Sequence, residues 1–144
     1  MNNKGFTKME ILVVVVLVGL VLSVAGFLLA NARKDNRDIK RLADVEKIRD
    51  ALEFYFYACN RYPASISTGS SISGEECGGG VYLSVVPRDP RGVDYKYVPC
   101  VLESTWRCEE GINNAESYLL EYTLEGNSAG ISAGKHAANP TSLY

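Results

Sequence analysis

The stretch KGFTKMEILVVVV, residues 4–16, decides the fold of this chain. It opens an apolar run from Ile11 to Ala30 that contains no charged residue and has Ser23 as its only polar side chain. At about 1.5 Å per residue, a helix over this run is roughly 30 Å long, which matches the hydrocarbon core of a bilayer. Glu10 stands at the threshold of the run, where a carboxylate is costly unless it is paired. The stretch therefore predicts a membrane helix with one unexplained charge.

Two ordinary kinds of targeting segment explain part of this pattern. A secretory signal peptide accounts for the basic residues Lys4 and Lys8 and for an A-x-A match at residues 30–32, with the mature chain starting at Arg33. Its apolar core, however, is normally shorter than this one. A plain membrane anchor accounts for the length and the charges but gives Glu10 no role.

A third pattern accounts for Glu10 as well. A basic leader ends at Gly5, the apolar Phe6 and then Thr7 follow, and glutamate is the fifth residue after the glycine, directly before the apolar run. This arrangement resembles the class III signal of type IV pilins and type II secretion pseudopilins. The resemblance implies a leader peptide of residues 1–5, cleavage between Gly5 and Phe6 by a prepilin peptidase, and N-methylation of Phe6. One position departs from the family, because Phe27 stands where many members have proline.

The resemblance also implies a role for Glu10 in assembly. In the family, this glutamate is thought to meet the N-terminal amine of a neighbouring subunit. Such a pair at 4 Å, in surroundings of effective dielectric near 20, interacts by about 4 kcal/mol before desolvation is subtracted. The alternative is that Glu10 lies among the lipid headgroups.

After residue 30 the composition becomes strongly charged, and no proline or glycine interrupts residues 27–58. Apolar residues recur there every three or four positions, which predicts an amphipathic helix. They are Ile39, Leu42, Val45, Ile48, Leu52, Tyr55 and Cys59. Most of the charges between them, a set that includes Arg41 and Asp44, are expected on a solvated face. We expect one helix from about Phe6 to Ala58, roughly 80 Å long, with an apolar half at 6–30 and an amphipathic half at 31–59.

Residues 60–144 are expected to form a loop and a small antiparallel sheet. Strands are predicted at residues 94–102, 105–108 and 117–125, arranged as a three-stranded meander. Two elements resemble the major pseudopilin of type II secretion systems: Asn60-x-Tyr62-Pro63, and a turn with Pro87, Asp89, Pro90 and Gly92. The chain is therefore expected to adopt the α+β type IV pilin fold, in which a long N-terminal helix with a protruding apolar half packs on the sheet.

Four cysteines, Cys59, Cys77, Cys100 and Cys108, follow the apolar run. An even number of cysteines beyond a membrane segment indicates two disulfides in an oxidising compartment. A zinc site normally needs close C-x₂₋₄-C pairs, which this spacing lacks. Of the three possible connectivities we favour Cys59–Cys77 with Cys100–Cys108, because each pair closes a short loop rich in turn residues.

We expect no metal, no cofactor and no catalytic residue. Members of the resembled class commonly hold calcium in their C-terminal loops through acidic side chains, but residues 126–144 contain no Asp or Glu. His136 is the only histidine, and no nucleophile, phosphate-binding or zinc-protease motif is present. The net charge of −2, with both signs mixed, argues against nucleic acid as a partner.

The sequence therefore predicts a structural filament subunit, either a pilin or a pseudopilin. Its expected partners are copies of itself in a helical homopolymer, the prepilin peptidase and methylase, and the pilus or secretion assembly machinery. Its expected location is the cytoplasmic membrane of a bacterial or archaeal-type cell as a single-pass protein, and then an extracellular or periplasmic filament. The alternative is a membrane-anchored or secreted binding module, stabilised by disulfides, that does not assemble.

Overall fold

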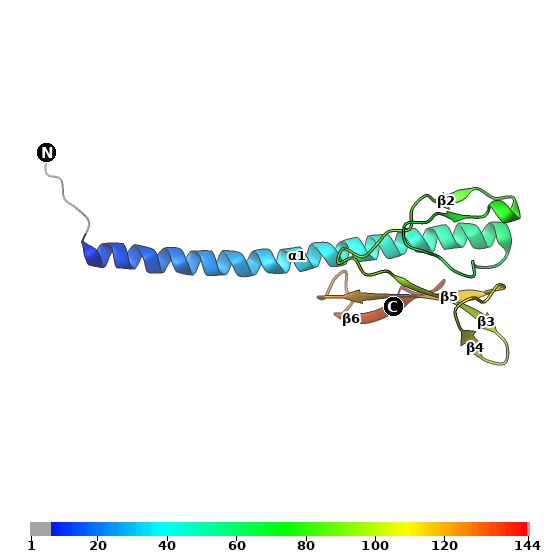
Figure 1. Cartoon of the computed structure of the whole chain (residues 1–144). Helices are drawn as coiled ribbons and strands as arrows, with labels where there is room; N and C mark the ends of the chain where they lie inside the picture. The colour runs from blue at the N-terminus through cyan, green and yellow to red at the C-terminus, as the bar shows by residue number, and fades with distance from the viewer. Residues whose placement is uncertain (1–6, 144) are drawn as a thin grey trace. The chain divides into compact units, whose positions relative to one another are not determined.

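The computed structural model describes residues 7–143, so the expected cleavage junction Gly5–Phe6 lies outside the described residues. Contacts divide the chain into two compact units, residues 1–34 and residues 35–144. A single helix, α1 (Lys8–Cys59), contributes its first part to one unit and its second part to the other (Figure 1). The predicted long helix is therefore confirmed, with its end one residue beyond Ala58.

In the first unit, α1 exposes apolar side chains all around its axis. The residues from Ile11 to Val18 are each at least half exposed, and Phe27 is 67% exposed. The hydroxyl of Ser23 donates a hydrogen bond to the carbonyl oxygen of Leu20 at 2.8 Å, so the one polar side chain of the run is satisfied within the helix. By length and composition, this is the one segment of residues 7–143 that could cross a membrane.

In the second unit, one face of α1 is buried, and charged residues share it with apolar ones. The buried positions are Asp38, Arg41, Asp44, Val45, Ile48, Ala51, Leu52 and Tyr55. The prediction that Arg41 and Asp44 lie on a solvated face is wrong, and so is the prediction that Ile39 belongs to the buried stripe, because its side chain is 58% exposed. At about 100° per residue, Ile39 points well away from the line through positions 38, 41, 45 and 48.

The helix ends through a left-handed residue. Asn60 has φ 53°, a region that asparagine tolerates better than most residues, and its N–H donates to the carbonyl oxygen of Phe56 at 2.7 Å. Tyr62 then forms an isolated bridge with Ala115, and Pro63 follows. The end of the helix thus lies at the Asn-x-Tyr-Pro element, as the sequence indicated.

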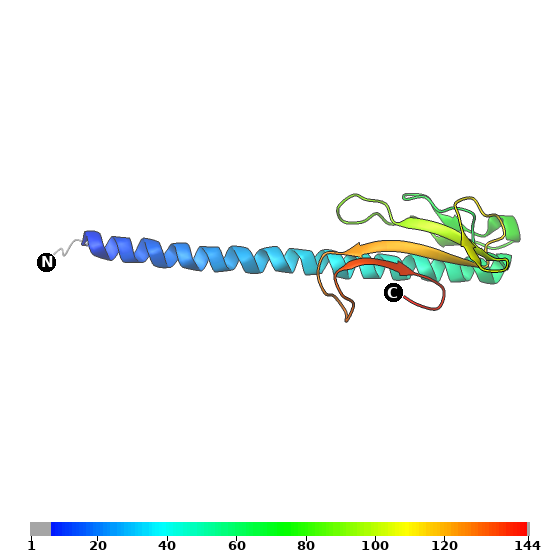
Figure 2. The same ribbon diagram turned by 90° about the horizontal axis from the view of Figure 1, so that it is seen from below.

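The main sheet is antiparallel and has the strand order β4-β3-β5-β6 (Figures 1 and 2). Its strands are β3 (Lys96–Leu102), β4 (Trp106–Cys108), β5 (Ser117–Leu124) and β6 (Gly134–Ala138). The predicted three-stranded meander is wrong in its pairing, because β5 lies beside β3 and not beside β4. The tight β3–β4 hairpin leaves the other edge of β3 free, and residues 109–116 carry the chain back to that edge. The fourth strand was missed because GKHAA has neither β-branched residues nor an apolar alternation.

The predicted loop after α1 contains a small second sheet. Strands β1 (Ile72–Ser73) and β2 (Val81–Leu83) pair around the short 3₁₀ helix η1 (Glu75–Cys77). Gly79, between η1 and β2, leaves room for the side chain of Tyr82, because a Cβ at this position would stand 2.0 Å from the Tyr82 hydroxyl. The Cys59–Cys77 disulfide joins this small sheet to the end of α1.

The core lies between α1 and the main sheet. On β5, alternate residues from Tyr118 to Leu124 are buried, and they belong to the same cluster as Val45 and Ile48 of α1. Tyrosine rings contribute to this core, and the ring centroids of Tyr118 and Tyr62 are 4.9 Å apart in an edge-to-face contact. The predicted α+β fold, a long N-terminal helix packed on a small antiparallel sheet, is confirmed.

The four cysteines form the two pairs that loop length favoured, Cys59–Cys77 and Cys100–Cys108. Each disulfide closes a loop and so lowers the conformational entropy of the unfolded chain, which stabilises the folded state by about 3 kcal/mol. We therefore expect a reducing agent to lower the melting temperature of the globular unit by several degrees. A calcium chelator should leave it unchanged, because residues 126–144 lack carboxylates. Thermal melts of the full chain in detergent, with each reagent alone, test this expectation. A melting temperature that falls with the chelator but does not change with the reducing agent would contradict it.

Candidate functional site

The first candidate is the N-terminal turn of α1, where Glu10 bonds to its own chain. The N–H of Glu10 donates to the hydroxyl oxygen of Thr7 at 3.3 Å, and the N–H of Thr7 donates to the Glu10 carboxylate at 3.5 Å. This reciprocal pair is a capping box, which satisfies two N–H groups that the helix itself leaves unpaired. The spacing Thr-x-x-Glu could have predicted it. Glu10 therefore stabilises the first turn, whatever else it does.

Directly after this turn, the chain offers a large apolar surface. An apolar stripe on one side of a helix indicates packing against one partner, whereas a helix that is apolar all round needs cover on every side. The exposed residues from Ile11 to Leu29 are of the second kind. Soluble proteins rarely expose contiguous apolar patches larger than a few hundred Å², so this surface requires lipid or other helices around it.

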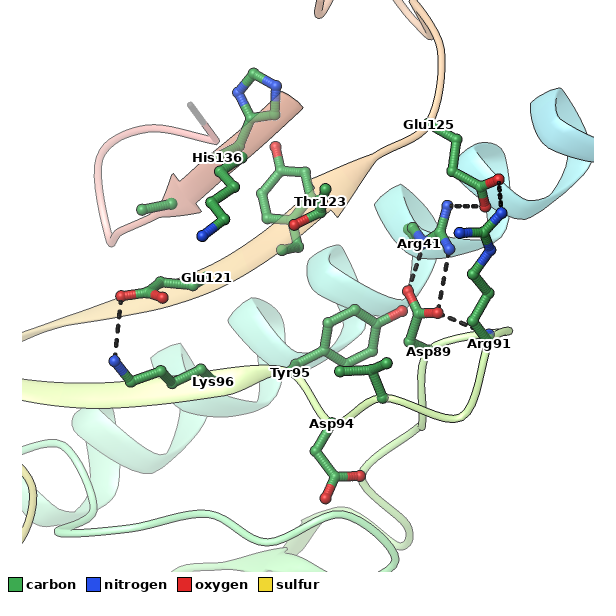
Figure 3. Close-up of a pocket in the computed structure, with 14 residues that line it drawn as sticks. Arg41, Asp89, Arg91, Asp94, Tyr95, Lys96, Glu121, Thr123, Glu125 and His136 are labelled. Carbon is green, nitrogen blue, oxygen red and sulfur yellow. Dashed lines mark hydrogen bonds and ion pairs between the residues drawn. The ribbon is translucent and has the colours of Figure 1, made fainter. Parts of the chain in front are cut away.

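The second candidate lies in the globular unit and centres on Arg41. Its guanidinium binds three carboxylates: Asp89 through a forked pair of hydrogen bonds, Asp38 at 2.6 Å and Glu125 at 2.8 Å. The Arg41 side chain is only 3% exposed. Figure 3 shows Arg41 between Asp89 on one side and Glu125 on the other. We call Asp38, Arg41, Asp89 and Glu125 the Arg41 cluster.

Asp38 links the Arg41 cluster to the backbone at the end of β5. Its carboxylate, which is fully buried, accepts hydrogen bonds from the N–H groups of Glu125 at 3.0 Å and Gly126 at 2.8 Å. A buried carboxylate is tolerated when charge and hydrogen bonds compensate it, and Asp38 has both. It thereby fixes the point at which the chain leaves the sheet.

The turn at residues 87–92, which resembles the pseudopilin element, contributes Asp89 to the cluster. Asp89 accepts a hydrogen bond from the backbone N–H of Arg91 at 2.7 Å, and Gly92 takes the positive φ of 81° that closes the turn. The guanidinium of Arg91 then reaches Glu125 at 2.7 Å. The residues of this turn therefore serve to present Asp89 and Arg91 to partners on α1 and after β5.

The cations keep two carboxylates of this cluster, Asp89 and Glu125, ionised. Hydrogen bonds from Arg37, and then from Arg41, lower the pKa of Glu125 to about 2. Burial raises the pKa of Asp89, but the hydrogen bonds from Arg41 and from the Arg91 backbone outweigh it and leave that pKa below its usual value. The hydrogen bond to Asp89 raises the pKa of Arg41 against the effect of burial. At neutral pH Asp89 and Glu125 are thus ionised, and Arg37 and Arg91 supply, together with Arg41, the positive charge that faces the carboxylates.

A groove of about 620 Å³ opens beside the cluster, between the Asp89–Lys96 segment, β5 and β6 (Figure 3). Lys96 and Glu121, which are opposite each other on the neighbouring strands β3 and β5, both line it, with their charged groups 3.6 Å apart. His136 lies on its β6 side, where its Nε2 is 2.8 Å from the carbonyl oxygen of Ser132. Both signs of charge line the groove, so its electrostatics select neither an anion nor a cation.

The predicted site residues thus have different outcomes. The cysteines are brought together in pairs, whereas Gly5 and Phe6 lie outside the described residues. The Arg41 cluster was missed. Its one local signal is the Asp38–Arg41 spacing of three residues, and many solvated helices show the same spacing.

Comparison with known proteins relates the chain to one family. The chain is 31% identical over 105 residues to the type II secretion system core protein G of Vibrio cholerae serotype O1, a match that covers 67% of this chain and 71% of that protein. The corresponding protein of Klebsiella pneumoniae is 33% identical over 104 residues, covering 66% of this chain and 74% of the relative. The chain belongs to the type II secretion core protein G family.

A third core protein G, from Pectobacterium carotovorum subsp. carotovorum, is 32% identical over 104 residues, and the match covers 66% of each protein. No family model matches the chain, and no solved structure matches it. The core protein G relationship agrees with the resemblance to pilins and pseudopilins around Gly5, and with the major-pseudopilin elements at residues 60–63 and 87–92. It also agrees with the long helix and small sheet of the fold.

Proposed function

We propose that this chain is a pseudopilin, a structural subunit of a filament of the type II secretion kind. The observation that carries the proposal is the exposed, all-round apolar surface from Ile11 to Leu29 in a chain of the core protein G family. In the membrane, lipid covers that surface. In a filament, the same helices of neighbouring copies cover it, so one segment serves both states without refolding.

Processing prepares the chain for this exchange. A prepilin peptidase cleaves between Gly5 and Phe6, removes residues 1–5, and Phe6 is then N-methylated. The new amine of Phe6 lies four residues before Glu10. Before assembly, the Glu10 carboxylate is held by the N–H of Thr7. In the filament it pairs with the Phe6 amine of a neighbouring copy, which sets the register between adjacent helices.

The globular unit belongs on the periplasmic side of the membrane. Its two disulfides suit an oxidising compartment. Its ion pairs and tyrosine core hold a compact head on α1, and its role is structural and not catalytic. The assembly machinery of the secretion system is the further partner. A membrane-anchored binding module that does not assemble would leave the pattern from Gly5 to Glu10 without a role.

The mass of the N-terminal peptide of the mature chain tests this function. We expect a peptide that begins at Phe6 and carries one added methyl group. The variant Gly5→Leu, purified in the same way, serves as the control and should retain Met1, because the cleavage junction is altered. A wild-type chain that starts at Arg33 would show ordinary secretion, and one that retains Met1 would show a plain anchor. Either result would contradict the proposal.

A further inference from the structure

The β3–β4 hairpin has a free edge within residues 7–143. Strand β4 (Trp106–Cys108) is the outermost strand of the sheet and has β3 as its only neighbour there (Figure 1). Along the β3–β4 pair, hydrogen-bonded and non-hydrogen-bonded residue pairs alternate. The N–H of Glu109 donates to the carbonyl oxygen of Pro99, and the N–H of Glu103 donates to the carbonyl oxygen of Thr105. The residues between these bonded positions direct their backbone groups away from β3. Trp106 and Cys108 therefore present N–H and C=O groups along the outer edge.

The same hairpin exposes two large apolar side chains. Leu102 and Trp106 are opposite each other in the register and are 51% and 55% exposed. They lie on the face of the sheet that turns away from α1, since the core positions of β3 alternate with them. Val98 and Cys100 share this face, and both are buried yet stand outside the main core cluster. Leu102 and Trp106 thus form the exposed end of an apolar strip that leads to the free edge.

Two features hold this hairpin in shape. The Cys100–Cys108 disulfide joins a directly opposed pair whose Cα atoms are 4.0 Å apart. On the hairpin, Arg107 binds Glu103 at 2.7 Å and Glu109 at 2.9 Å. A rigid edge loses little conformational entropy when a partner docks on it, which favours binding.

The charge around the hairpin is one-sided. Residues 100–116 contain Glu103, Glu109, Glu110 and Glu116, and Arg107 is their only basic residue. Because Arg107 already binds two of the glutamates, the surroundings of the edge are acidic. Nucleic acid and anionic lipid are repelled by such a surface, whereas a basic protein segment is attracted to it.

We propose that the β3–β4 hairpin is a docking site for an extended, basic segment of a partner protein, which adds to the sheet as a strand beside β4. Main-chain hydrogen bonds to Trp106 and Cys108 would supply the pairing, and an apolar side chain of the partner would cover Leu102 and Trp106. Lysine or arginine at the alternate positions would face the glutamates. The proposal does not depend on filament assembly, because the hairpin lies wholly within the globular unit.

Trp106 is the only tryptophan of the chain, so its fluorescence reports directly on the site. The probe is a short synthetic peptide that alternates valine with lysine, titrated into the full chain in uncharged detergent micelles. We expect a saturable shift of the Trp106 emission to shorter wavelength. Two control peptides test the charge and the pairing. One has glutamate in place of lysine, and the other has N-methyl groups on the amides that would face β4. Each should bind at least about tenfold more weakly, a difference of about 1.4 kcal/mol.

A matched pair of variants completes the test. Leu102→Ser should weaken binding of the lysine peptide by about tenfold or more, as expected for an apolar contact at the centre of a small interface. Val85→Ser removes an equally exposed apolar side chain elsewhere and should bind like the wild type. Both should melt like the wild type. The proposal would be overturned by equal binding of the N-methylated or glutamate peptide, by equal effects of the two variants, or by no saturation up to about 1 mM.

Discussion

Replacing Arg41 with methionine should lower the free energy of unfolding of the globular unit by about 3–5 kcal/mol. Methionine has a similar reach and packs well, so the loss comes from the charge and not from a cavity. Without the guanidinium, Asp38 and Asp89 lose their main counter-ion while they stay buried or nearly so. A buried carboxylate without its partner either pays for its desolvation or takes up a proton at the expense of folding.

Urea denaturation of the full chain in detergent, followed by Trp106 fluorescence, measures this loss. Lys40→Met is the matched control, because it removes a cation from the adjacent, exposed position of α1. That variant should unfold within about 0.5 kcal/mol of the wild type. Arg41→Lys should fall between them, because lysine keeps the charge but cannot make the forked contact with Asp89. If Arg41→Met and Lys40→Met unfold at the same urea concentration, the cluster does not hold the unit together.

The Arg41 cluster also shows where prediction from the sequence reaches its limit. The long helix, its end at Cys59 and the inward residues of β5 all follow from local patterns, which a single segment displays by itself. The burial of Arg41 does not follow from a local pattern, because its partners Asp89 and Glu125 come from segments far along the chain. A helix with mixed charges is most often solvated, and only the tertiary fold decides otherwise.

The sheet illustrates the same limit for strand order. Periodicity indicated β3 and β5, but the choice of neighbour depends on the length of the connections. Strand β4 offers an edge of only three residues, whereas the other edge of β3 pairs with β5 over five positions, and the chain returns along that edge. Strand β6 gains its place from pairing with β5 and not from its own composition, since Gly134 and Ala138 have low strand propensity.

In contrast, the N-terminal turn carries a local pattern, Thr-x-x-Glu, that predicts its capping box. The family resemblance implies one role for Glu10, pairing with an amine on a neighbouring copy, and the structure adds a second, the capping box with Thr7. These roles make different demands. Capping needs only an oxygen that accepts a hydrogen bond, whereas pairing with an amine needs the negative charge.

Replacing Glu10 with glutamine separates the two roles. Glutamine also serves as the third residue of a capping box, so the first turn of α1 should persist. Its neutral amide cannot form the ion pair. We expect both Glu10→Gln and Glu10→Ala to remain in the membrane, because the apolar surface from Ile11 onwards is unchanged. Both should assemble at least about tenfold less filament than the wild type, since the pair is worth up to about 4 kcal/mol before desolvation.

The amount of this chain in filaments sheared from cells, relative to the amount in the membrane fraction, measures assembly. Glu46→Gln is the matched control, because it neutralises an exposed carboxylate on the same helix, and it should assemble normally. If Glu10→Gln assembles like the wild type while Glu10→Ala does not, the capping box carries the effect and the ion pair is unnecessary. If both assemble normally, Glu10 has neither role in the filament. Failure of Glu10→Gln alongside Glu10→Ala would support the charge as the feature that neighbouring helices recognise.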